Sequence, residues 1–287
     1  MEENLRFFAE HYLWLIPVGF VVGAYGTLIG AGGGFVLVPL LLVIYPNDSP
    51  ELIASISLAV VFFNALSGSI AYARMKRVDF KSGVIFSVAT IPGAILGALS
   101  TAYIPRRLFD QIFGLLMIGA AVYLFLEPVG EAEVKLVNPH GGTPRTPGYY
   151  FTTTIIDADG GKYTFSYNPL VGIGVSFFVG FVSSLLGVGG GFIHVPALVH
   201  LLDFPVHIAT ATSHFILAIM ALAGTVVHVM TGTFAHGVRR TILLAIGVLF
   251  GAQLGAYFSN RVRGDWIIRG LAVALAFVGF RILSVAW

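Results

Sequence analysis

The sequence contains no cysteine and few charged residues. Only 10% of its 287 residues are charged, whereas 57% are hydrophobic. Without cysteine the chain forms no disulfide, no thiolate metal site and no thiol nucleophile. Soluble domains carry about 25% charged residues, so this composition predicts a membrane protein in contact with the lipid bilayer. The net charge of +2 and the lack of a long basic run exclude nucleic acid as a partner.

Acidic side chains are missing from the middle of every apolar segment. Transporters of cations usually place a carboxylate within the membrane, where it offsets the charge of the substrate. Its absence here favours an anionic or neutral substrate and argues against a proton relay made of carboxylates. All fourteen acidic residues lie in loops or near segment ends, among them Asp48, Glu51, Asp79, Asp110, Asp203 and Asp265.

Two glycine clusters lie at matching positions in two halves of the chain. Residues 30–34 read Gly-Ala-Gly-Gly-Gly and residues 187–191 read Gly-Val-Gly-Gly-Gly, an offset of 157. Each cluster is followed by Phe and, four residues later, by Pro. Two such clusters in the same apolar context predict an internal repeat. The expected domains are a first transmembrane repeat (1–126), a soluble inter-repeat loop (127–168) and a second transmembrane repeat (169–287).

Each half holds four apolar segments, and the first of them has an unusual length. About 34 helical residues span about 50 Å, against a hydrocarbon core of about 30 Å, yet two full crossings need about 40 residues. Because glycine also interrupts helices, we predict an all-α polytopic membrane protein whose first segments are re-entrant hairpins with the glycines at their tips. The segments are 12–45, 52–73, 82–102 and 108–126, then 169–202, 207–230, 240–259 and 266–286.

Three transmembrane helices follow each predicted hairpin, and this odd number makes the second repeat inverted relative to the first. Inverted repeats with broken helices that meet near the bilayer midplane are typical of secondary transporters. In the alternative arrangement each first segment is one tilted span, and the two repeats are parallel.

The loop between the repeats is the one water-soluble part of the chain. Alternating residues on both sides of an Asp-Ala-Asp-Gly-Gly run, 157–161, predict a β-hairpin. The two aspartates lack the other ligands of a calcium loop, so a plain turn is expected. A basic cluster between the second and third segments predicts that this side of the cell membrane, and the loop with it, is cytoplasmic. Its members are Arg74, Lys76, Arg77 and Lys81.

The glycine clusters are the first candidate binding site. Backbone N–H groups that are left free where a helix begins bind anions, helped by the positive end of the helix dipole. In inverted repeats the two tips would face each other across one cavity. In the alternative, the glycines only permit close packing at a kink. The predicted substrate-binding residues here are Gly32, Gly33, Gly34 and Phe35, with Gly189, Gly190, Gly191 and Phe192.

Polar side chains near the starts of the second helices of the two repeats extend this site. Ser57 and Asn64 lie in the first repeat, and Thr212 and Ser213 lie in the second. Hydroxyl and amide groups at this depth would donate hydrogen bonds to an oxyanion, although each hydroxyl alone is as well explained by a bond to its own helix backbone. Asn64 carries the strongest signal, because a buried amide needs several partners.

Six of the eight histidines lie in the second half, and two of them are candidates for proton coupling. His194 follows the second glycine cluster by three residues, and His214 lies in the next helix. Histidine titrates near neutral pH, so either residue would couple anion movement to protons; the alternative is a packing role. A membrane metalloenzyme is disfavoured, because the histidine spacings fit neither zinc nor di-iron sites. The sequence therefore predicts no cofactor and no metal.

At these residues the chain resembles the sulfite exporter TauE/SafE family, also called the toluene sulfonate uptake permease family. The resemblance rests on the two glycine motifs, each continued to Val-Pro (30–39 and 187–196), and on the run 209–213. It implies a secondary transporter, not an enzyme, for small sulfur-containing anions such as sulfite, sulfoacetate or other organosulfonates, with protons as a candidate coupling ion. It supports the two tips together with Ser57 and Thr212. An uncoupled anion channel and a homo-oligomer stay open as alternatives.

Overall fold

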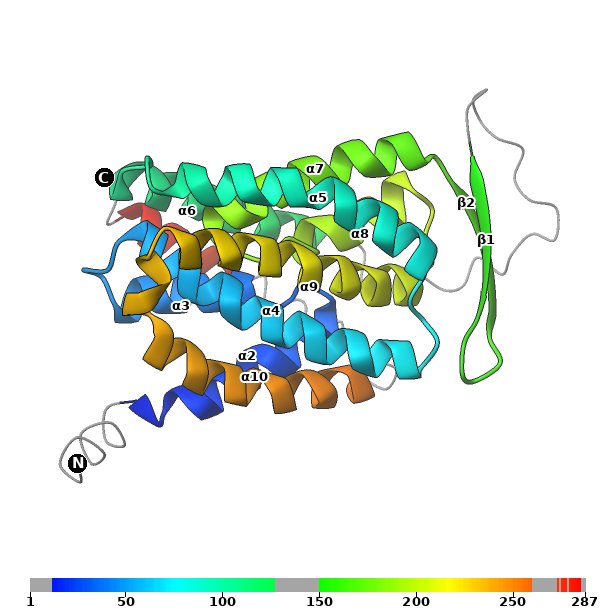
Figure 1. Cartoon of the computed structure of the whole chain (residues 1–287), viewed down its shortest axis with the longest axis horizontal. Coiled ribbons are helices and arrows are strands. Elements are labelled where there is room, and N and C mark those ends of the chain that lie inside the picture. The colour runs from blue at the N-terminus through cyan, green and yellow to red at the C-terminus, as the bar shows by residue number, and fades with distance from the viewer. Residues whose placement is uncertain (1–11, 127–149, 260–272, 274, 278, 285–287) are drawn as a thin grey trace.

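A computed structural model describes residues 12–126, 150–259, 273, 275–277 and 279–284, and these are mostly helical (Figure 1). Residues 127–149 of the predicted loop and most of the predicted segment 266–286 lie outside the described residues. The helices and strands, in chain order, are α2 (Leu15–Ile29), α3 (Gly34–Ile44), α4 (Pro50–Arg74), α5 (Phe80–Thr101), α6 (Arg106–Leu126), β1 (Phe151–Ile156), β2 (Lys162–Tyr167), α7 (Pro169–Leu186), α8 (Gly191–Leu201), α9 (Val206–Met230), η1 (Thr233–His236) and α10 (Val238–Phe258).

Five of these helices are long and apolar enough to cross a membrane: α4, α5, α7, α9 and α10. The prediction of a mostly helical membrane protein with a small two-stranded insert is confirmed. Capping residues set where helices begin. Ser49 accepts a hydrogen bond from the N–H of Leu52 at the start of α4, and Asp79 accepts one from the N–H of Ser82 at the start of α5. Such side chains satisfy backbone donors that a first helical turn leaves unpaired.

Helices from the two halves of the chain are paired crosswise. α5 packs on α7, where Cβ atoms placed on Gly93 and Gly97 would lie 2.2 Å from the carbonyl oxygens of Phe177 and Phe181. Only glycine permits so close an approach between helix backbones in lipid. The contact therefore joins a helix before the β-hairpin to a helix after it.

The second crosswise pair, α10 on α2, has the same construction. Cβ atoms placed on Gly251 and Gly255 would lie 2.1 Å from the carbonyl oxygens of Phe20 and Ala24. Phe20 and Ala24 precede the two α7 contact residues by 157 positions, the offset of the glycine clusters. The two pairs are thus matched residue by residue.

α4 and α9 form the centre of the bundle and run in opposite directions (Figure 1). A Cβ atom placed on Gly68 of α4 would lie 2.7 Å from the ring of His214, and one placed on Gly224 of α9 would lie 3.0 Å from Leu58. Gly68 and Gly224 are separated by the same number of residues as Leu58 and His214. The contact is therefore reciprocal, with leucine in one half where the other half has histidine.

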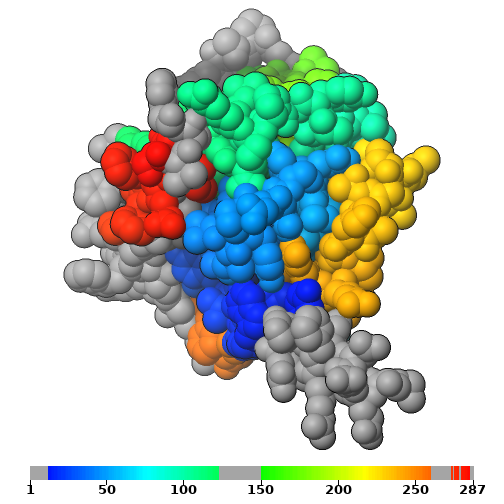
Figure 2. All heavy atoms as spheres, turned by 90° about the vertical axis from the view of Figure 1, so that its left-hand side faces the viewer, coloured from blue at the N-terminus to red at the C-terminus, as the bar shows by residue number. Residues whose placement is uncertain are grey.

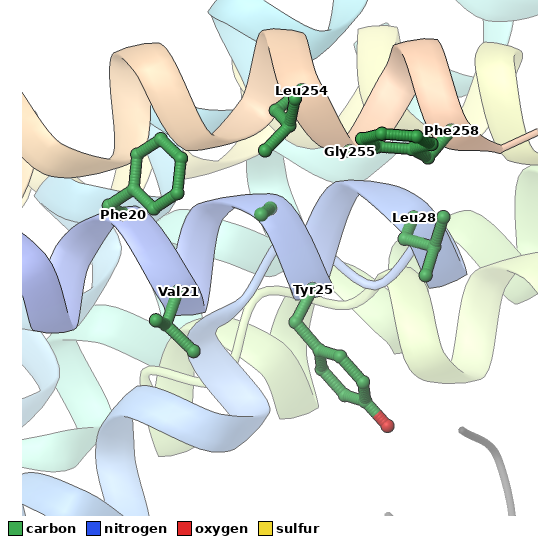
Figure 3. Close-up of a pocket in the computed structure, with 8 residues that line it drawn as sticks. Phe20, Val21, Tyr25, Leu28, Leu254, Gly255 and Phe258 are labelled. Carbon is green, nitrogen blue, oxygen red and sulfur yellow. The ribbon is translucent and has the colours of Figure 1, made fainter. Parts of the chain in front are cut away.

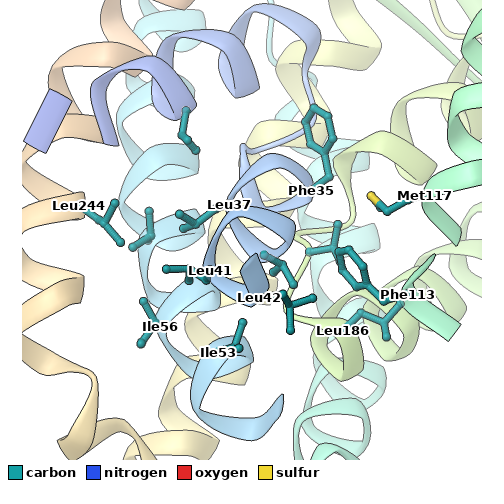
Figure 4. Close-up of a cluster of buried hydrophobic side chains, with 14 of the residues drawn as sticks. Phe35, Leu37, Leu41, Leu42, Ile53, Ile56, Phe113, Met117, Leu186 and Leu244 are labelled. Atoms are coloured by element: carbon teal, nitrogen blue, oxygen red, sulfur yellow. The ribbon is translucent and has the colours of Figure 1, made fainter. Parts of the chain in front are cut away.

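The short helix α3 packs against residues of α4, α6, α7 and α10 (Figure 4). Leu37 and Leu41 point toward α10 and α4, and Leu42 points toward α6 and α7. Leu37 and Leu41 are at most 1% exposed, so α3 is held as firmly as a core strand or helix of a soluble domain. This packing fixes the position of the first glycine break, which immediately precedes α3.

The β-hairpin lies across one end of the bundle (Figure 1). Its strands pair in antiparallel register from Phe151 with Tyr167 to Ile156 with Lys162, around the predicted Asp-Gly turn. Tyr167 packs on the ring of Phe204 in the loop before α9, with ring centroids 5.1 Å apart. The insert is therefore part of the folded body.

The outside of the bundle is apolar, as a lipid-facing surface requires. Val88, Phe178 and Phe250 are each more than half exposed. A shallow groove between α2 and α10 opens on this surface and is lined by Phe20, Leu254 and other apolar side chains (Figure 3). Figure 2 shows the end opposite the hairpin, where the blue segment between α3 and α4 lies between the gold region around η1 and the red C-terminal residues.

Candidate functional site

Both helix breaks are made of glycines in left-handed backbone conformations. Gly30 ends α2 with a φ of 84°, and Gly32 and Gly33 follow with φ values of 76° and 79°. Gly187 ends α7 with a φ of 69°, and Gly189 follows at 68°. Residues with side chains rarely adopt these angles, so the glycines determine where both helices stop.

After each break the chain turns back beside the helix it has just left. A Cβ atom placed on Gly33 would lie 3.0 Å from the side chain of Val22, a residue in the middle of α2. A Cβ atom placed on Gly190 would lie 2.4 Å from the side chain of Val179, which occupies the matching place in α7. The short helices α3 and α8 therefore start alongside α2 and α7.

The two breaks are in direct contact with each other. A Cβ atom placed on Gly34 would lie 2.2 Å from the carbonyl oxygen of Val188, and one placed on Gly191 would lie 2.3 Å from the carbonyl oxygen of Gly30. This differs from the expectation of tips that face each other across a cavity. In this conformation the backbones of the two breaks approach too closely at these points to hold a ligand between them.

Several backbone N–H groups at the breaks have no hydrogen-bond acceptor among the described residues. Two of the N–H groups expected to be free are used locally: Gly32 donates to the carbonyl of Gly26 over 3.1 Å, and Gly191 donates to that of Gly189 over 2.8 Å. Unpaired buried N–H groups are rare, and at a helix start they favour an anion. The unpaired groups are those of Gly33, Gly34 and Phe35, and of Gly189, Gly190 and Phe192.

A polar side chain from α4 faces the first break. The Oδ1 atom of Asn64 accepts a hydrogen bond from the hydroxyl of Thr27 over 3.2 Å. The Nδ2 atom of Asn64 has no partner in the described part of the chain and lies 3.5 Å from a Cβ atom placed on Gly33. An amide NH₂ group only donates hydrogen bonds. Backbone and side-chain donors therefore meet at this break.

His214 reaches the same region from α9. Its Nδ1 lies 3.2 Å from the carbonyl oxygen of Thr210, and its Nε2 lies 3.2 Å from a Cβ atom placed on Gly68, one helical turn beyond Asn64. Its ring meets that of Tyr72 edge-on, with centroids 5.4 Å apart. Because a carbonyl only accepts, a neutral His214 ring carries its proton on Nδ1. Nε2 is then a bare acceptor, and it has no partner among the residues described.

The second break has neither an amide nor a histidine at the positions that match Asn64 and His214. Leu58 occupies the place that matches His214, and Met220 occupies the place that matches Asn64. The hydroxyl of Ser184, which contacts the glycine region of α9, has no hydrogen-bond partner in the described segments. A Cβ atom placed on Gly190 would lie 2.4 Å from the hydroxyl oxygen of Ser183, which also has no hydrogen-bond partner among the described residues. Both breaks therefore have hydroxyl donors nearby, but the amide and the histidine belong to the first.

The predicted hydroxyl residues are buried at different places. Ser57 and Ser213 are fully buried, and the structure gives neither hydroxyl a partner within the ranges it describes. The hydroxyl of Thr212 accepts a hydrogen bond from the N–H of Asp79 over 3.0 Å, at the end of the bundle that carries the β-hairpin. Thr212 is thus engaged in joining α9 to the start of α5.

The other predicted histidine, His194, lies in α8 on the side of the β-hairpin. Its Nε2 is 3.1 Å from the hydroxyl of Ser176, and its ring centroid is 6.5 Å from that of Phe86. His194 and His214 are therefore held by different neighbours, and of the two, His214 is the one beside the side-chain donors of the first break.

Thr27, Asn64, Tyr72 and His214 form a polar cluster at the first break, which we call the first-break cluster. Two of its residues, Thr27 and Tyr72, were missed by sequence reasoning. Thr27 lies three residues before the glycines, and the hydroxyl of Tyr72 donates to the Thr27 carbonyl over 2.9 Å. A lone threonine in an apolar run was the available signal. The pairing of Tyr72 with α2 depends on tertiary packing and leaves no local pattern. Among the described residues, no group of three His, Asp or Glu side chains is placed to hold a metal ion.

The sequence is similar to those of known membrane transporter proteins. The family model described as "Sulfite exporter TauE/SafE" matches residues 15–282. The chain is 33% identical to "Probable membrane transporter protein YunE" of Bacillus subtilis (strain 168), covering 95% of this chain and 97% of that protein. It is 24% identical to "Probable membrane transporter protein MJ0441" of Methanocaldococcus jannaschii, with 86% of each chain covered. No solved structure matches it significantly.

Proposed function

Because the chain belongs to the sulfite exporter TauE/SafE family, we propose that it is a secondary transporter of small sulfur-containing anions, such as sulfite, sulfoacetate or other organosulfonates. The observation that carries this proposal is the pair of helix breaks in contact, with unpaired N–H groups at both. Helix starts attract anions through these groups and through the helix dipole. Acidic residues of the described helices lie near helix ends, so no described carboxylate opposes an anion there.

The two halves act as inverted repeats with re-entrant first segments. Matched contacts at a constant offset, between α5 and α7 and between α10 and α2, support this arrangement, as do the opposite directions of α4 and α9 (Figure 1). The breaks then lie near the midplane of the cell membrane, where secondary transporters bind their substrates. The contact between the breaks corresponds to a closed state, and rocking of one half against the other opens the site to each side in turn.

The end that carries the β-hairpin faces the cytoplasm. The described basic residues at this end are Arg74, Lys76, Arg77, Lys81 and Lys162, against Arg106, Arg107, Arg239 and Arg240 at the opposite end, where Arg106 and Arg240 are bound to aspartates. Positive charge in short loops is retained on the cytoplasmic side during insertion. α9 begins at this end of the bundle (Figure 1), and His214 is the ninth of its 25 residues, so His214 then lies in the cytoplasmic half of α9.

Proton coupling operates through His214 in this proposal. Its Nε2 is an unpaired acceptor in the cluster that also contains the unpaired amide of Asn64, so protonation converts an atom that repels an anion into a donor. An anion and a proton would then bind together more tightly than either alone, which is the linkage that coupled transport needs.

Uptake by proteoliposomes tests the function. Purified protein is reconstituted, and accumulation of labelled sulfite, thiosulfate and sulfoacetate is measured with and without an imposed pH gradient, with acetate and chloride as controls. Saturable uptake of a sulfur anion that the pH gradient drives above equilibrium supports the proposal. Uptake that never exceeds equilibrium identifies an uncoupled channel, and no uptake by correctly folded protein contradicts the function.

A further inference from the structure

A second fully buried histidine lies at the other end of α9, away from the first break. His228 is 0% exposed, and neither ring nitrogen has a hydrogen-bond partner among the described residues. It follows His214 by fourteen residues, which is about 21 Å along a helix. A buried imidazole without partners is costly, so a role beyond packing is expected of it.

The nearest charged group to His228 is a carboxylate that water can reach. The Oε1 atom of Glu51, in the first turn of α4, lies 4.0 Å from Nδ1 of His228, and the Glu51 side chain is 24% exposed. The same Oε1 accepts a hydrogen bond of 2.5 Å from the hydroxyl of Thr233 in η1. Glu51 is therefore held between the aqueous surface and a buried imidazole.

The other charged groups described at this end are occupied or point to water. Asp48 is paired with Arg240. A second pair joins Asp110 to Arg106 over 2.8 Å. On η1 and α10, His236 and Arg239 are exposed. Glu51 is thus the carboxylate available to balance a charge on His228.

Comparison of His228 with the residue at the matching position of the first half indicates that His228 does more than fill space. By the offset that relates Gly68 to Gly224, His228 matches Tyr72. The Tyr72 hydroxyl fills its place with a hydrogen bond to the carbonyl of Thr27 over 2.9 Å. The His228 side chain is shorter than that of tyrosine, and neither of its ring nitrogens makes a hydrogen bond within the described residues.

We propose that His228 and Glu51 form the proton-loading site on the face opposite the β-hairpin. A proton from the water on that side passes by way of the Glu51 carboxylate to a ring nitrogen of His228. The product is an imidazolium–carboxylate pair, which loses the same proton when the site empties. This assignment rests on the proposed proton-coupled function. It adds a second proton site, so that His214 serves the side of the breaks toward the β-hairpin and His228 serves the opposite side.

The test separates anion exchange from proton-driven accumulation in proteoliposomes. Exchange of labelled anion at equal pH on both sides needs no net proton movement, whereas accumulation driven by a pH gradient does. For His228→Gln and Glu51→Gln we expect exchange close to that of the unmodified protein and a loss of about tenfold or more in pH-driven accumulation. His236→Gln, an exposed histidine at the same end, is the matched control and should behave as the unmodified protein.

Each outcome is decisive for one of the two proposals. If the unmodified protein shows no anion exchange, the proposed transport function fails irrespective of His228. If exchange is present and both variants keep full pH-driven accumulation, the proton-loading site is wrong. Should His228→Gln fail to fold, Glu51→Gln decides, because its side chain is partly exposed. Parallel loss of exchange and accumulation in Glu51→Gln, with unchanged melting temperature, would also overturn the assignment to protons.

Discussion

The aromatic rings of Phe35 and Phe192 face each other with centroids 6.2 Å apart, and each residue is the second of the short helix that follows a glycine break. The two residues are separated by 157 positions, the offset of the two glycine clusters, so each contacts the residue at the matching position of the other half. A residue meets its counterpart where a twofold relation between two halves has its axis. The proposed anion site therefore lies next to the point where these two counterparts meet.

Adding a methyl group at this junction should be harmful. Gly34→Ala would press a Cβ atom against the carbonyl oxygen of Val188, where only 2.2 Å is available. Such overpacking typically costs about 1–3 kcal/mol. We expect a lower melting temperature and loss of anion uptake.

The matched control for this change is Gly174→Ala in α7, where nothing lies within 4 Å of the added atom. Alanine replaces glycine favourably inside a helix, by about 0.5–1 kcal/mol, so the control should melt at the same temperature or higher. Equal stability and uptake in Gly34→Ala and Gly174→Ala would show that the contact between the breaks is unimportant.

Asn64→Asp separates the two roles of the Asn64 side chain. The variant keeps an oxygen to accept the Thr27 hydroxyl, but it replaces the unpaired Nδ2 group with a second carboxyl oxygen. This oxygen repels a bound anion when the carboxyl group is ionised, and it offers one O–H in place of two N–H donors when burial keeps the group protonated. We expect anion affinity to fall by about tenfold or more, which corresponds to about 1.4 kcal/mol. Isothermal titration with the transported anion measures this, and unchanged affinity would remove Asn64 from the site.

His214→Leu places in the second half the residue that the first half has at the matching position, Leu58. The change removes the titratable group beside the first break. It introduces leucine, the side chain that is already buried at the matching position of α4. We expect anion exchange to persist and the pH-driven component of uptake to disappear. Uptake measured from pH 5.5 to pH 8 gives the comparison, across the range in which histidine titrates. A variant that remains as pH-dependent as the unmodified protein would contradict coupling through His214.

The ion pair between the β-hairpin and Arg77, in the loop between α4 and α5, should make the stability of the protein depend on pH in the acid range. Arg77 lies 3.3 Å from the Asp157 carboxylate, and the two side chains are 6% and 2% exposed. Burial alone would raise the pKa of Asp157, but the hydrogen bond from the N–H of Gly161 and the Arg77 guanidinium outweigh it and hold this pKa below its usual value. The stabilisation is complete above the unfolded-state pKa of about 4 and is lost as pH falls through the lower folded-state pKa.

Melting temperature measured between pH 3 and pH 7 checks this effect. Asp157→Asn should flatten the acid limb of the curve. Arg77→Met at neutral pH leaves a buried carboxylate without its guanidinium and should cost about 3 kcal/mol. Thr154→Ala, on the exposed face of β1, is the control and should change neither measurement. An Asp157→Asn curve with the same acid limb as the unmodified protein would show that another group causes the loss.

Local features of the fold were predictable from the sequence. The helix breaks at both glycine clusters follow from the conformational preference of glycine, and the hairpin follows from the Asp-Gly turn. The crosswise pairing of α2 with α10 and of α5 with α7 was not predicted. It depends on contacts such as Gly251 with Phe20, which are distant in sequence and leave no periodic signal of their own.

The candidate site was predictable in its backbone but only partly in its side chains. The glycines and Asn64 were identified because glycine clusters and a buried amide are unusual in apolar segments. Thr27 and Tyr72 were not, since a hydroxyl in a membrane helix usually bonds to its own backbone. The direct contact of the breaks, in place of a cavity, depends on how closely two whole halves approach, which no local pattern encodes.

The central claim is that an anion binds at the glycine breaks, and an anion panel measured by thermal shift tests it most directly. Detergent-purified protein and Asn64→Asp are melted with sulfite, thiosulfate, sulfate, sulfoacetate, taurine, acetate and chloride. We predict that a sulfur oxyanion selectively raises the melting temperature of the unmodified protein and not that of Asn64→Asp. The claim is contradicted if no anion stabilises a folded sample, or if Asn64→Asp is stabilised equally.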